Sequence, residues 1–374
     1  MKKKIYWCKS CLNMSTRPRI QFDKKQICNA CTWSRKKKIF NWNFRKKELA
    51  NLIKKYKSKN DNFDCIVPVS GGKDGSYVSY KLKHEFGMRP LTVTSRPPLT
   101  LKVGNQNLEN FVRSGYDHIH VTPNEEVMKT FNKIGFVEMG FPYYGWLISI
   151  FSVVLKISLS FKIPLIFYGE NGEVEYGGNL EKNTPRVSLK EISKVFFEGG
   201  YKKIFNKLKK NKKNLFWFEM PEAREKDFYL THWSYFEPWD SYRNYLVAKK
   251  NCNLTESKMT NPGTFTNFAQ TDQALYDLHT YLMYLKFGFG RATQDVGIEI
   301  RRGAMTRDQG VNLVKLYDGQ FPNHNLDLYL DYYKMSKKEF SKVLDKWANK
   351  KIFYKCSKEK IWKPKFIVDE VFTY

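Results

Sequence analysis

The chain has 374 residues, a formal net charge of +28 at pH 7, and 42% hydrophobic residues. That length allows a full α/β domain with one or two smaller modules, and that apolar share excludes wholesale disorder. Residues 1–60 carry 19 Lys/Arg against two acidic residues, a net of +17, and residues 201–214 add seven lysines. Charge alone leaves open whether these segments are solvated faces or a docking surface for phosphates, nucleic acid or an acidic partner protein.

Residues 1–40 are predicted to form a small cysteine module. Cys8 and Cys11, then Cys28 and Cys31, make two C-x-x-C pairs separated by sixteen residues. Each pair can place two sulfurs on one tetrahedral ion, and so short a module lacks the core to fold without one. We therefore expect a zinc ribbon with a structural Zn²⁺ that has no open coordination position. An iron–sulfur cluster is the alternative, because thiolates alone do not specify the metal.

Residues 41–60 are predicted as a basic helical connector. The start of the chain shows no secretory signal, and seven cysteines, an odd number, favour reduced thiols in the cytoplasm. The most apolar segment, residues 143–161, is interrupted by Lys156 and falls short of the ~20 residues that a membrane span needs. We predict a buried helix there and no membrane span.

Between residues 61 and 310, short apolar runs alternate with helical stretches. The predicted strands are FDCIVPV (63–69), RPLTVTS (89–95), DHIHVTP (117–123) and IPLIFYG (163–169). Such alternation predicts a Rossmann-like α/β domain with a parallel sheet covered on both faces. Within it, residues 180–262 have no clean period and are predicted as an insertion of uncertain structure. Residues 311–374 are predicted as a helical C-terminal region, in which Ser336 and Glu339 form a capping box.

The sequence SGGKDGS, residues 70–76, lies where the first predicted strand gives way to a helix. Gly71 and Gly72 let backbone N–H groups approach an anion, and a helix starting near Ser76 adds the positive end of its dipole. The spacing is neither a Walker A loop nor a dinucleotide fingerprint. It resembles the PP-loop, SGGxDS, of the HUP-type ATP pyrophosphatases, which cut ATP between the α- and β-phosphates. Gly75 stands where that motif has serine, so the hydroxyl contact comes from Ser76 or is missing.

Further segments occur in one order along the chain: the two C-x-x-C pairs, SGGKDGSY, NLENFVRSGYDHI (107–119), YGEN (168–171), Trp239–Asp240, and FGFGRATQDVGIEIRRGAMTRDQG (287–310). Together they resemble the WbpG/PseA-like N-acetyl sugar amidotransferases of bacterial surface-glycan synthesis, over residues 8 to about 320. The resemblance implies conversion of an acetamido group on a nucleotide-linked sugar into an acetamidino group. ATP would form an O-adenylyl intermediate that ammonia attacks, in the biosynthesis of lipopolysaccharide O-antigen or of flagellin glycans such as pseudaminic acid.

The resemblance also implies roles for individual residues, with ATP and Mg²⁺ bound at the glycine loop. Lys73 would neutralise the phosphates and Asp74 would hold Mg²⁺, while the phosphates would be surrounded by Ser70, Gly71, Gly72, Gly75 and Ser76. Glu170 and Asn171, at a strand end, would touch Mg²⁺ or the acetamido group, unless they only form a turn. Arg291 and Thr293 would bind phosphates. Sugar or nucleotide charges would be reached by Asp295, Arg301 and Arg302, for which solvated surface is the alternative.

The chain has no glutaminase elbow G-x-C-x-G, and its second residue is Lys2, so ammonia must come from elsewhere. The resemblance implies a separate glutaminase and a synthase-like barrel subunit, for which the basic N-terminal face is a candidate dock. A PP-loop tRNA-modifying enzyme, of the thiolase or lysidine type, is the main rival, because phosphate binding would also account for the basic residues. A non-enzymatic zinc-ribbon nucleic-acid adaptor is the third possibility.

Overall fold

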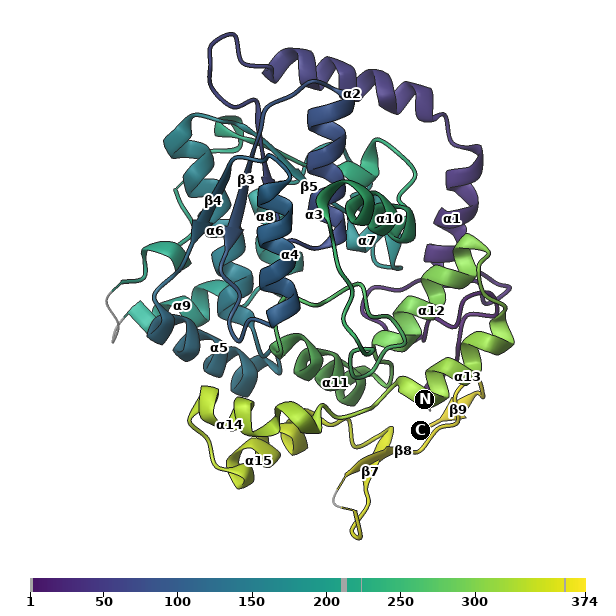
Figure 1. The fold of residues 1–374 in the computed structure, drawn as a ribbon. Helices are drawn as coiled ribbons and strands as arrows, with labels where there is room; N and C mark the ends of the chain where they lie inside the picture. The colour runs from purple at the N-terminus through teal and green to yellow at the C-terminus, as the bar shows by residue number, and fades with distance from the viewer. Residues whose placement is uncertain (1–2, 210–213, 223, 360) are drawn as a thin grey trace.

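The computed structural model describes residues 3–209, 214–222, 224–359 and 361–374, so part of the lysine run, 210–213, lies outside it. A five-stranded parallel sheet in the order β4-β3-β2-β5-β6 lies at its centre (Figure 1). Its strands are β2 (Cys65–Pro68), β3 (Pro90–Ser95), β4 (His118–Val121), β5 (Leu165–Tyr168) and β6 (Tyr229–His232). The predicted parallel-sheet α/β fold is confirmed, including its four predicted strands.

Helices cover both faces of this sheet because successive side chains of its strands point to opposite sides. Cys65 and Val67 pack in the layer that contains α3 (Lys73–Tyr80), α4 (Lys102–Arg113) and α10 (Ser241–Cys252). Ile66, between them, packs on the other face against α6 (Tyr144–Phe161), beside α5 (Glu125–Met139). By length and composition α6 could cross a membrane, but 61% of its apolar window is buried inside the protein. It is the core helix that the sequence predicted.

The order of the strands places a crevice at one edge of the sheet. The chain steps outward from β2 to β3 and β4, and β5 then returns to pair with the other side of β2. In an open parallel sheet, ligands bind outside the carboxyl ends of the strands where the order reverses in this way. The segments that follow β2 and β5 therefore meet at the expected binding site. Pro68 is the last residue of β2, so its missing N–H costs the ladder little.

The segment predicted as an insertion, 180–262, belongs in part to the central domain. It supplies β6, which pairs in parallel with β5, and α10, which packs on α3. The segment also contains the short helix α8 (Leu189–Glu191) and α9 (Tyr201–Lys209). The prediction was wrong for β6 because its sequence YLTH buries Thr231 and His232, which hide the apolar pattern of a strand.

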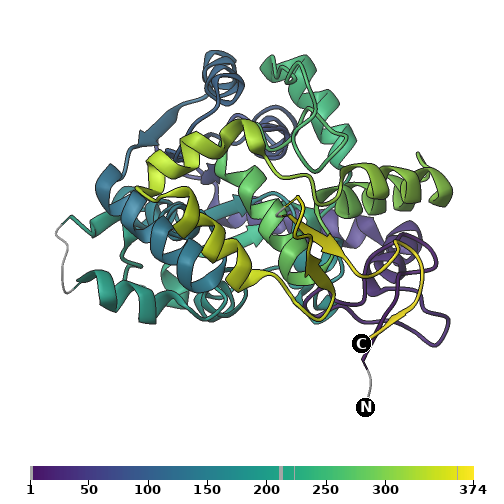
Figure 2. The same cartoon turned by 90° about the horizontal axis from the view of Figure 1, so that it is seen from below.

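The C-terminal part consists of helices followed by short strands. The helices are α11 (Leu275–Phe287), α12 (Arg291–Arg302), α13 (Arg307–Tyr317), α14 (Leu326–Tyr333) and α15 (Lys337–Trp347). Ser336 and Glu339 form the predicted capping box of α15. The region is not purely helical, since β7 (Phe353–Lys355) pairs with β8 (Trp362–Pro364) and β9 (Phe372–Thr373) pairs with β1 (Lys4–Ile5). The described ends of the chain therefore lie close together (Figures 1 and 2).

Asp277, in the first turn of α11, predicts a pH dependence of stability. It is 6% exposed, and burial raises its pKa from 3.8 to about 7. The folded state favours the neutral form of this carboxyl group. Its contribution to the free energy of unfolding is therefore fully present below about pH 4 and is lost as the pH rises through about 7. We expect Asp277→Asn to flatten that decrease and to be more stable than the parent chain at about pH 8, each pKa unit being worth about 1.4 kcal/mol.

Urea unfolding at about pH 5 and about pH 8 measures this difference. Asp327→Asn, in the exposed first turn of α14, is the matched control and should keep the parent pH dependence. An unchanged pH dependence in Asp277→Asn would contradict the assignment.

Candidate functional site

The glycine loop connects β2 to α3 at the crevice of the sheet. Helix α3 begins at Lys73 with Gly72 as its N-cap, three residues before the predicted start near Ser76. Gly71 has a φ of +78°, and a Cβ added there would lie 2.3 Å from the backbone nitrogen of Leu108. The loop therefore requires glycine at residue 71, both for its left-handed backbone and for its close approach to α4.

Gly71→Ala is expected to destabilise the protein more than the same change at Gly303. Both glycines have positive φ, +78° and +84°, but nothing lies within 4 Å of a Cβ at Gly303. Gly303→Ala should cost about 1–2 kcal/mol for the left-handed backbone alone. Gly71→Ala adds a clash with backbone atoms and should cost at least about 1 kcal/mol more. Urea unfolding of both variants measures the difference, and equal losses would show that the contact with α4 is unimportant.

A cavity of about 330 Å³ opens beside the loop at the switch point between β2 and β5. The loop contributes Ser70, Gly72, Lys73, Asp74 and Gly75, and the segment after β5 contributes Glu170 and Tyr176. Arg291, from much later in the chain, also lines the cavity. The other lining residues are Pro68, Tyr143, Trp146, Phe268, Ala269, Gln270, Thr271, Asp272 and Tyr276.

The glycine loop contributes one positive and one negative side chain to this cavity, Lys73 and Asp74. Lys73 forms an ion pair with Asp74, whose other carboxylate oxygen accepts a hydrogen bond of 3.1 Å from Asn244 Nδ2. Burial and the nearby carboxylate of Asp74 raise the pKa of Glu170. Tyr176 donates its hydroxyl to Glu170 Oε1 at 3.3 Å. The cavity thus combines an ion pair of Lys73 and Asp74 with a carboxyl group, that of Glu170, which takes up protons unusually readily.

Arg291 is a second cation among the residues that line the cavity. Burial alone would lower its pKa, but Asp295 and Tyr276 raise it. Its Nη2 lies 2.8 Å from Asp295 Oδ1, and its Nη1 donates to the hydroxyl of Tyr276 at 3.1 Å. These partners fix the guanidinium at the cavity wall, where it can pair with an anion.

Four of the residues predicted to bind ATP, Mg²⁺ or the acetamido group do not line this cavity, and neither do Asp295, Arg301 and Arg302. Gly71 faces α4, and Ser76 is fully buried with its hydroxyl unpaired within the described residues, because three helical residues separate it from the loop. Asn171 caps α7 (Gly172–Glu175) and donates to the carbonyl of Lys182, so it forms the strand-end turn. Thr293 donates to Asp318 and lies two residues after Arg291 in α12, on another helix face.

Several residues that line the cavity belong to no motif that could be recognised in the sequence. Tyr143 and Tyr276 stack with ring centroids 6.1 Å apart, although they come from different parts of the chain. The segment 268–272 includes Gln270, whose φ is +57°. Aromatic and amide side chains in loops carry little periodic signal, so only the fold brings these residues to the site.

The four predicted metal ligands come together in the N-terminal module. The thiols of Cys8, Cys11, Cys28 and Cys31 are buried, and their sulfurs all lie within 4.8 Å of one another. Backbone N–H groups of Ser10 and Cys28 donate to Cys8 Sγ at 3.4 and 3.2 Å, as expected around a thiolate. This cluster could hold a metal ion with a closed coordination sphere.

The cysteine module also holds the segment that follows β5. Arg19 forms a two-pronged ion pair with Glu173, at 2.6 and 2.8 Å. In α1 (Asn29–Ile39), Trp33 Nε1 and Lys37 Nζ contact the two carboxylate oxygens of Glu175 at 2.8 and 2.6 Å. Glu173 and Glu175 lie between Glu170 and Tyr176 in sequence. The module therefore positions one wall of the cavity.

Comparisons with known proteins address the C-terminal part most directly. Residues 262–366 match the model of a family described as "LPS biosynthesis protein WbpG-like, C-terminal domain". We call residues 262–366 the WbpG-like domain. The resemblance predicted from the sequence is confirmed over this segment. The WbpG-like domain supplies Arg291, Tyr276 and residues 268–272, which line the cavity together with the glycine loop.

A search of curated protein sequences finds no match. Among solved structures, one that matches is the U34-tRNA thiolase NcsA from Methanococcus maripaludis with its [4Fe-4S] cluster. The alignment covers 70% of the residues of this chain and 79% of the residues of the thiolase chain. The two chains are 13% identical over that alignment, with a TM-score of 0.32.

Proposed function

We propose that the protein is an ATP-dependent amidotransferase that converts the acetamido group of a nucleotide-linked sugar into an acetamidino group. The observation that carries this proposal is the shared cavity, in which the glycine loop faces the WbpG-like domain. The loop suits the phosphates of ATP, because Lys73 is a cation that lines the cavity and the N–H groups at the start of a helix favour anions. Asp74 is the residue that would hold Mg²⁺, which neutralises phosphate charge when bound.

The proposed reaction activates an unreactive amide. The acetamido oxygen attacks the α-phosphorus of ATP, pyrophosphate leaves, and an O-adenylyl imidate forms. Ammonia then adds to the imidate carbon and AMP leaves with the oxygen. In this proposal Glu170, whose raised pKa favours proton uptake, accepts the proton that ammonia loses. Lys73 and Arg291, which both line the cavity, stabilise the charge that builds on the phosphates.

We infer that ammonia reaches this site from separate proteins, a glutaminase and a synthase-like barrel subunit. The proposal follows from the sequence, which lacks a glutaminase elbow. The candidate dock is the basic face formed by α1 and by α2 (Trp42–Tyr56). Co-purification with tagged subunits tests the idea, and glutamine-dependent activity of the chain alone would refute it.

For the cysteine cluster we propose a structural Zn²⁺. The four buried thiols leave no position for water or substrate, and none of them lines the cavity beside the glycine loop. Metal analysis of protein purified without oxygen decides between zinc and an iron–sulfur cluster. Two or more irons with labile sulfide would overturn the assignment.

Modification of tRNA is the second candidate, favoured by the basic residues of the N-terminal region. Thiolation, however, requires a reactive cysteine near the glycine loop. Cys65 and Cys252 are buried, burial raises the pKa of both thiols, and neither lines the cavity. This weighs against a thiolase of that type.

One assay separates the two functions. The purified chain is incubated with ATP, Mg²⁺ and ammonium, together with either UDP- or CMP-linked acetamido sugars or bulk tRNA. We expect AMP release that depends on the sugar. AMP release that depends on tRNA would instead establish the second candidate, and ATP cleavage only at the terminal phosphate would exclude both.

A further inference from the structure

A second cavity, of about 470 Å³, lies next to the cysteine module and is lined in part by Arg301 and Arg302, which the resemblance placed near sugar or nucleotide charges. It is enclosed by α1, the start of α2, α7, the start of α10 and α12. Its volume falls within the range of sites that bind small organic molecules, ~300–1,000 Å³, and exceeds what ammonia would need. Tyr176 lines this cavity as well as the cavity beside the glycine loop, so the two share a wall.

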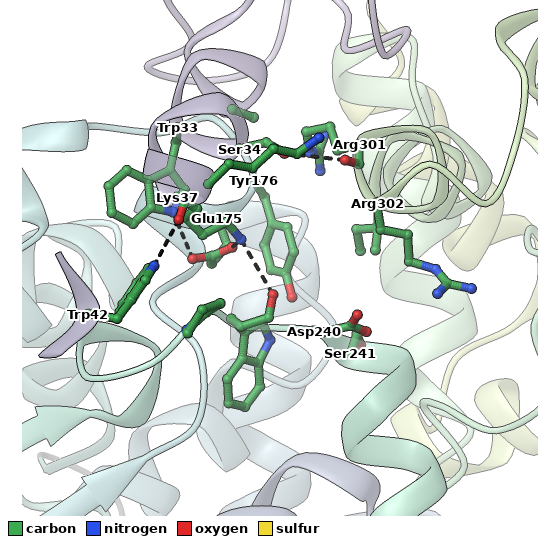
Figure 3. Close-up of a pocket in the computed structure, with 15 residues that line it drawn as sticks. Trp33, Ser34, Lys37, Trp42, Glu175, Tyr176, Asp240, Ser241, Arg301 and Arg302 are labelled. Carbon is green, nitrogen blue, oxygen red and sulfur yellow. Dashed lines mark hydrogen bonds and ion pairs between the residues drawn. The ribbon is translucent and has the colours of Figure 1, made fainter. Parts of the chain in front are cut away.

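The lining of the second cavity combines indole rings with basic side chains. Figure 3 shows Trp33 and Trp42 at one end, Arg301 and Arg302 at the other, and Tyr176 between them. Nucleobases stack on aromatic rings, and phosphates pair with guanidinium groups. A nucleotide carries these two features at its two ends, in the arrangement that the cavity offers.

Several polar groups of this cavity lack a protein partner within the described residues. Trp239 is 7% exposed, and its buried Nε1 has no acceptor. Arg301 Nη1 is likewise buried and unpaired, but Arg301 lies close enough to the thiols of Cys11 and Cys31 for them to raise its pKa against the effect of burial. Lys37 is neutralised by Glu175 and Arg302 pairs with Glu299, whereas Lys38 is exposed and has no acidic partner among the described residues. Buried donors without partners are rare in proteins, so Trp239 Nε1 points to a bound ligand.

The Trp239–Asp240 pair singled out in the sequence lies at the start of α10 in this cavity. Asp240 Oδ1 caps the helix by accepting from the N–H groups of Tyr242 and Arg243, at 2.9 and 3.0 Å. Its Oδ2 has no hydrogen bond within the described part of the chain, and Ser241 lies beside it in the lining. A carboxylate and a hydroxyl of this kind are suitable partners for the hydroxyl groups of a ribose.

We propose that the second cavity binds the nucleotide end of the nucleotide-linked sugar. The base lies against Trp33 and Trp42, and the phosphates lie toward Lys38 and Arg302. The sugar then extends past Tyr176, which brings its acetamido group to Glu170 and the glycine loop. This inference rests on the proposed function, and it assigns the recognition of the nucleotide to a site separate from that of ATP.

The test is calorimetric titration of UDP and of CMP into the full-length protein. We expect at least one of the two nucleotides to bind. The double variant Lys38→Ala with Arg302→Ala should raise the Kd of that nucleotide by about tenfold or more, since two phosphate contacts are lost. Lys36→Ala is the matched control, because Lys36 is an exposed lysine of α1 that does not line the cavity. Binding of ATP should be the same in the parent protein and in both variants, because the substituted residues lie outside the glycine loop.

The outcomes separate this inference from the proposed function. If UDP and CMP fail to bind while sugar-dependent AMP release persists, the nucleotide site is wrong and the function stands. If UDP or CMP binds equally well to the double variant, the assigned cavity is wrong. If nucleotides bind here as expected but no acetamido sugar causes AMP release, the proposed function fails while the binding site stands. Displacement of UDP by bulk tRNA at lower concentration than by free nucleotides would indicate an RNA site instead.

Discussion

Lys73→Ala is expected to lower sugar-dependent AMP formation by about 10²–10³-fold or more, the usual cost of removing one group that stabilises transition-state charge. Lys73 lines the cavity in the first turn of α3 and pairs with Asp74. Its ammonium is therefore placed to neutralise the phosphates as pyrophosphate leaves. Release of AMP from ATP, measured with saturating ammonium and sugar, gives the effect directly.

The folded state should survive this substitution, because the side chain lies at a cavity rather than in the core. Thermal unfolding followed by circular dichroism checks that point. Lys250→Ala, an exposed lysine in the last turn of α10, is the matched control and should keep full activity. Parent-like AMP formation in Lys73→Ala would show that the glycine loop does not act on ATP.

Cys28→Ala is expected to disrupt the cysteine module. Through the module it should also disturb the segment after β5, which contributes Glu170 and Tyr176 to the cavity beside the glycine loop. Loss of one of four ligands removes the cross-link that a module of ~40 residues needs, so stability should fall by several kcal/mol or about 5–10 °C in Tm. The contacts from Arg19, Trp33 and Lys37 to Glu173 and Glu175 should then be lost. We expect the KM for the sugar to rise about tenfold or more while ATP still binds.

Metal content, Tm, calorimetric ATP binding and the KM for the sugar measure this set of effects. Cys356→Ala is the matched control, because Cys356 lies outside the cluster and is only half-buried. An unchanged KM in a Cys28→Ala protein that has lost its metal would show that the module does not position the cavity. Equal loss of ATP binding would indicate general unfolding.

The fold could be predicted largely from the spacing of apolar runs and turn residues. Gly87 and Gly115 adopt the positive φ expected after helices, and the four predicted strands are present in parallel order. Several elements could not be predicted. Strand β6 has polar and aromatic side chains at buried positions, α5 begins shortly after β4, and the strands β7, β8 and β9 are only two or three residues long. Tertiary packing outweighs local pattern in such elements.

The residues of the site also fall into two groups, those in local motifs, which could be predicted, and those brought together only by the fold. The glycine loop and the cysteine pairs are local motifs, and their residues lie together as expected from spacing. Arg291 and Thr293 were grouped because they are near in sequence, but the start of α12 turns them to different faces. Tyr143, Tyr176 and Gln270 reach the cavity from distant segments, and only the fold brings them there. The chemical roles of all these residues stay predictions.

Strand β1 finds its partner, β9, at the other end of the chain, where Ile5 pairs with Phe372. During synthesis β1 therefore emerges from the ribosome long before β9, and its pairing must wait until residue 373 has been made. The cost in chain entropy of bringing together segments so far apart grows only slowly with their separation, so the delay matters more for the rate of folding than for stability. The cysteine module is made early, but its attachment through β1 waits for the synthesis of β9.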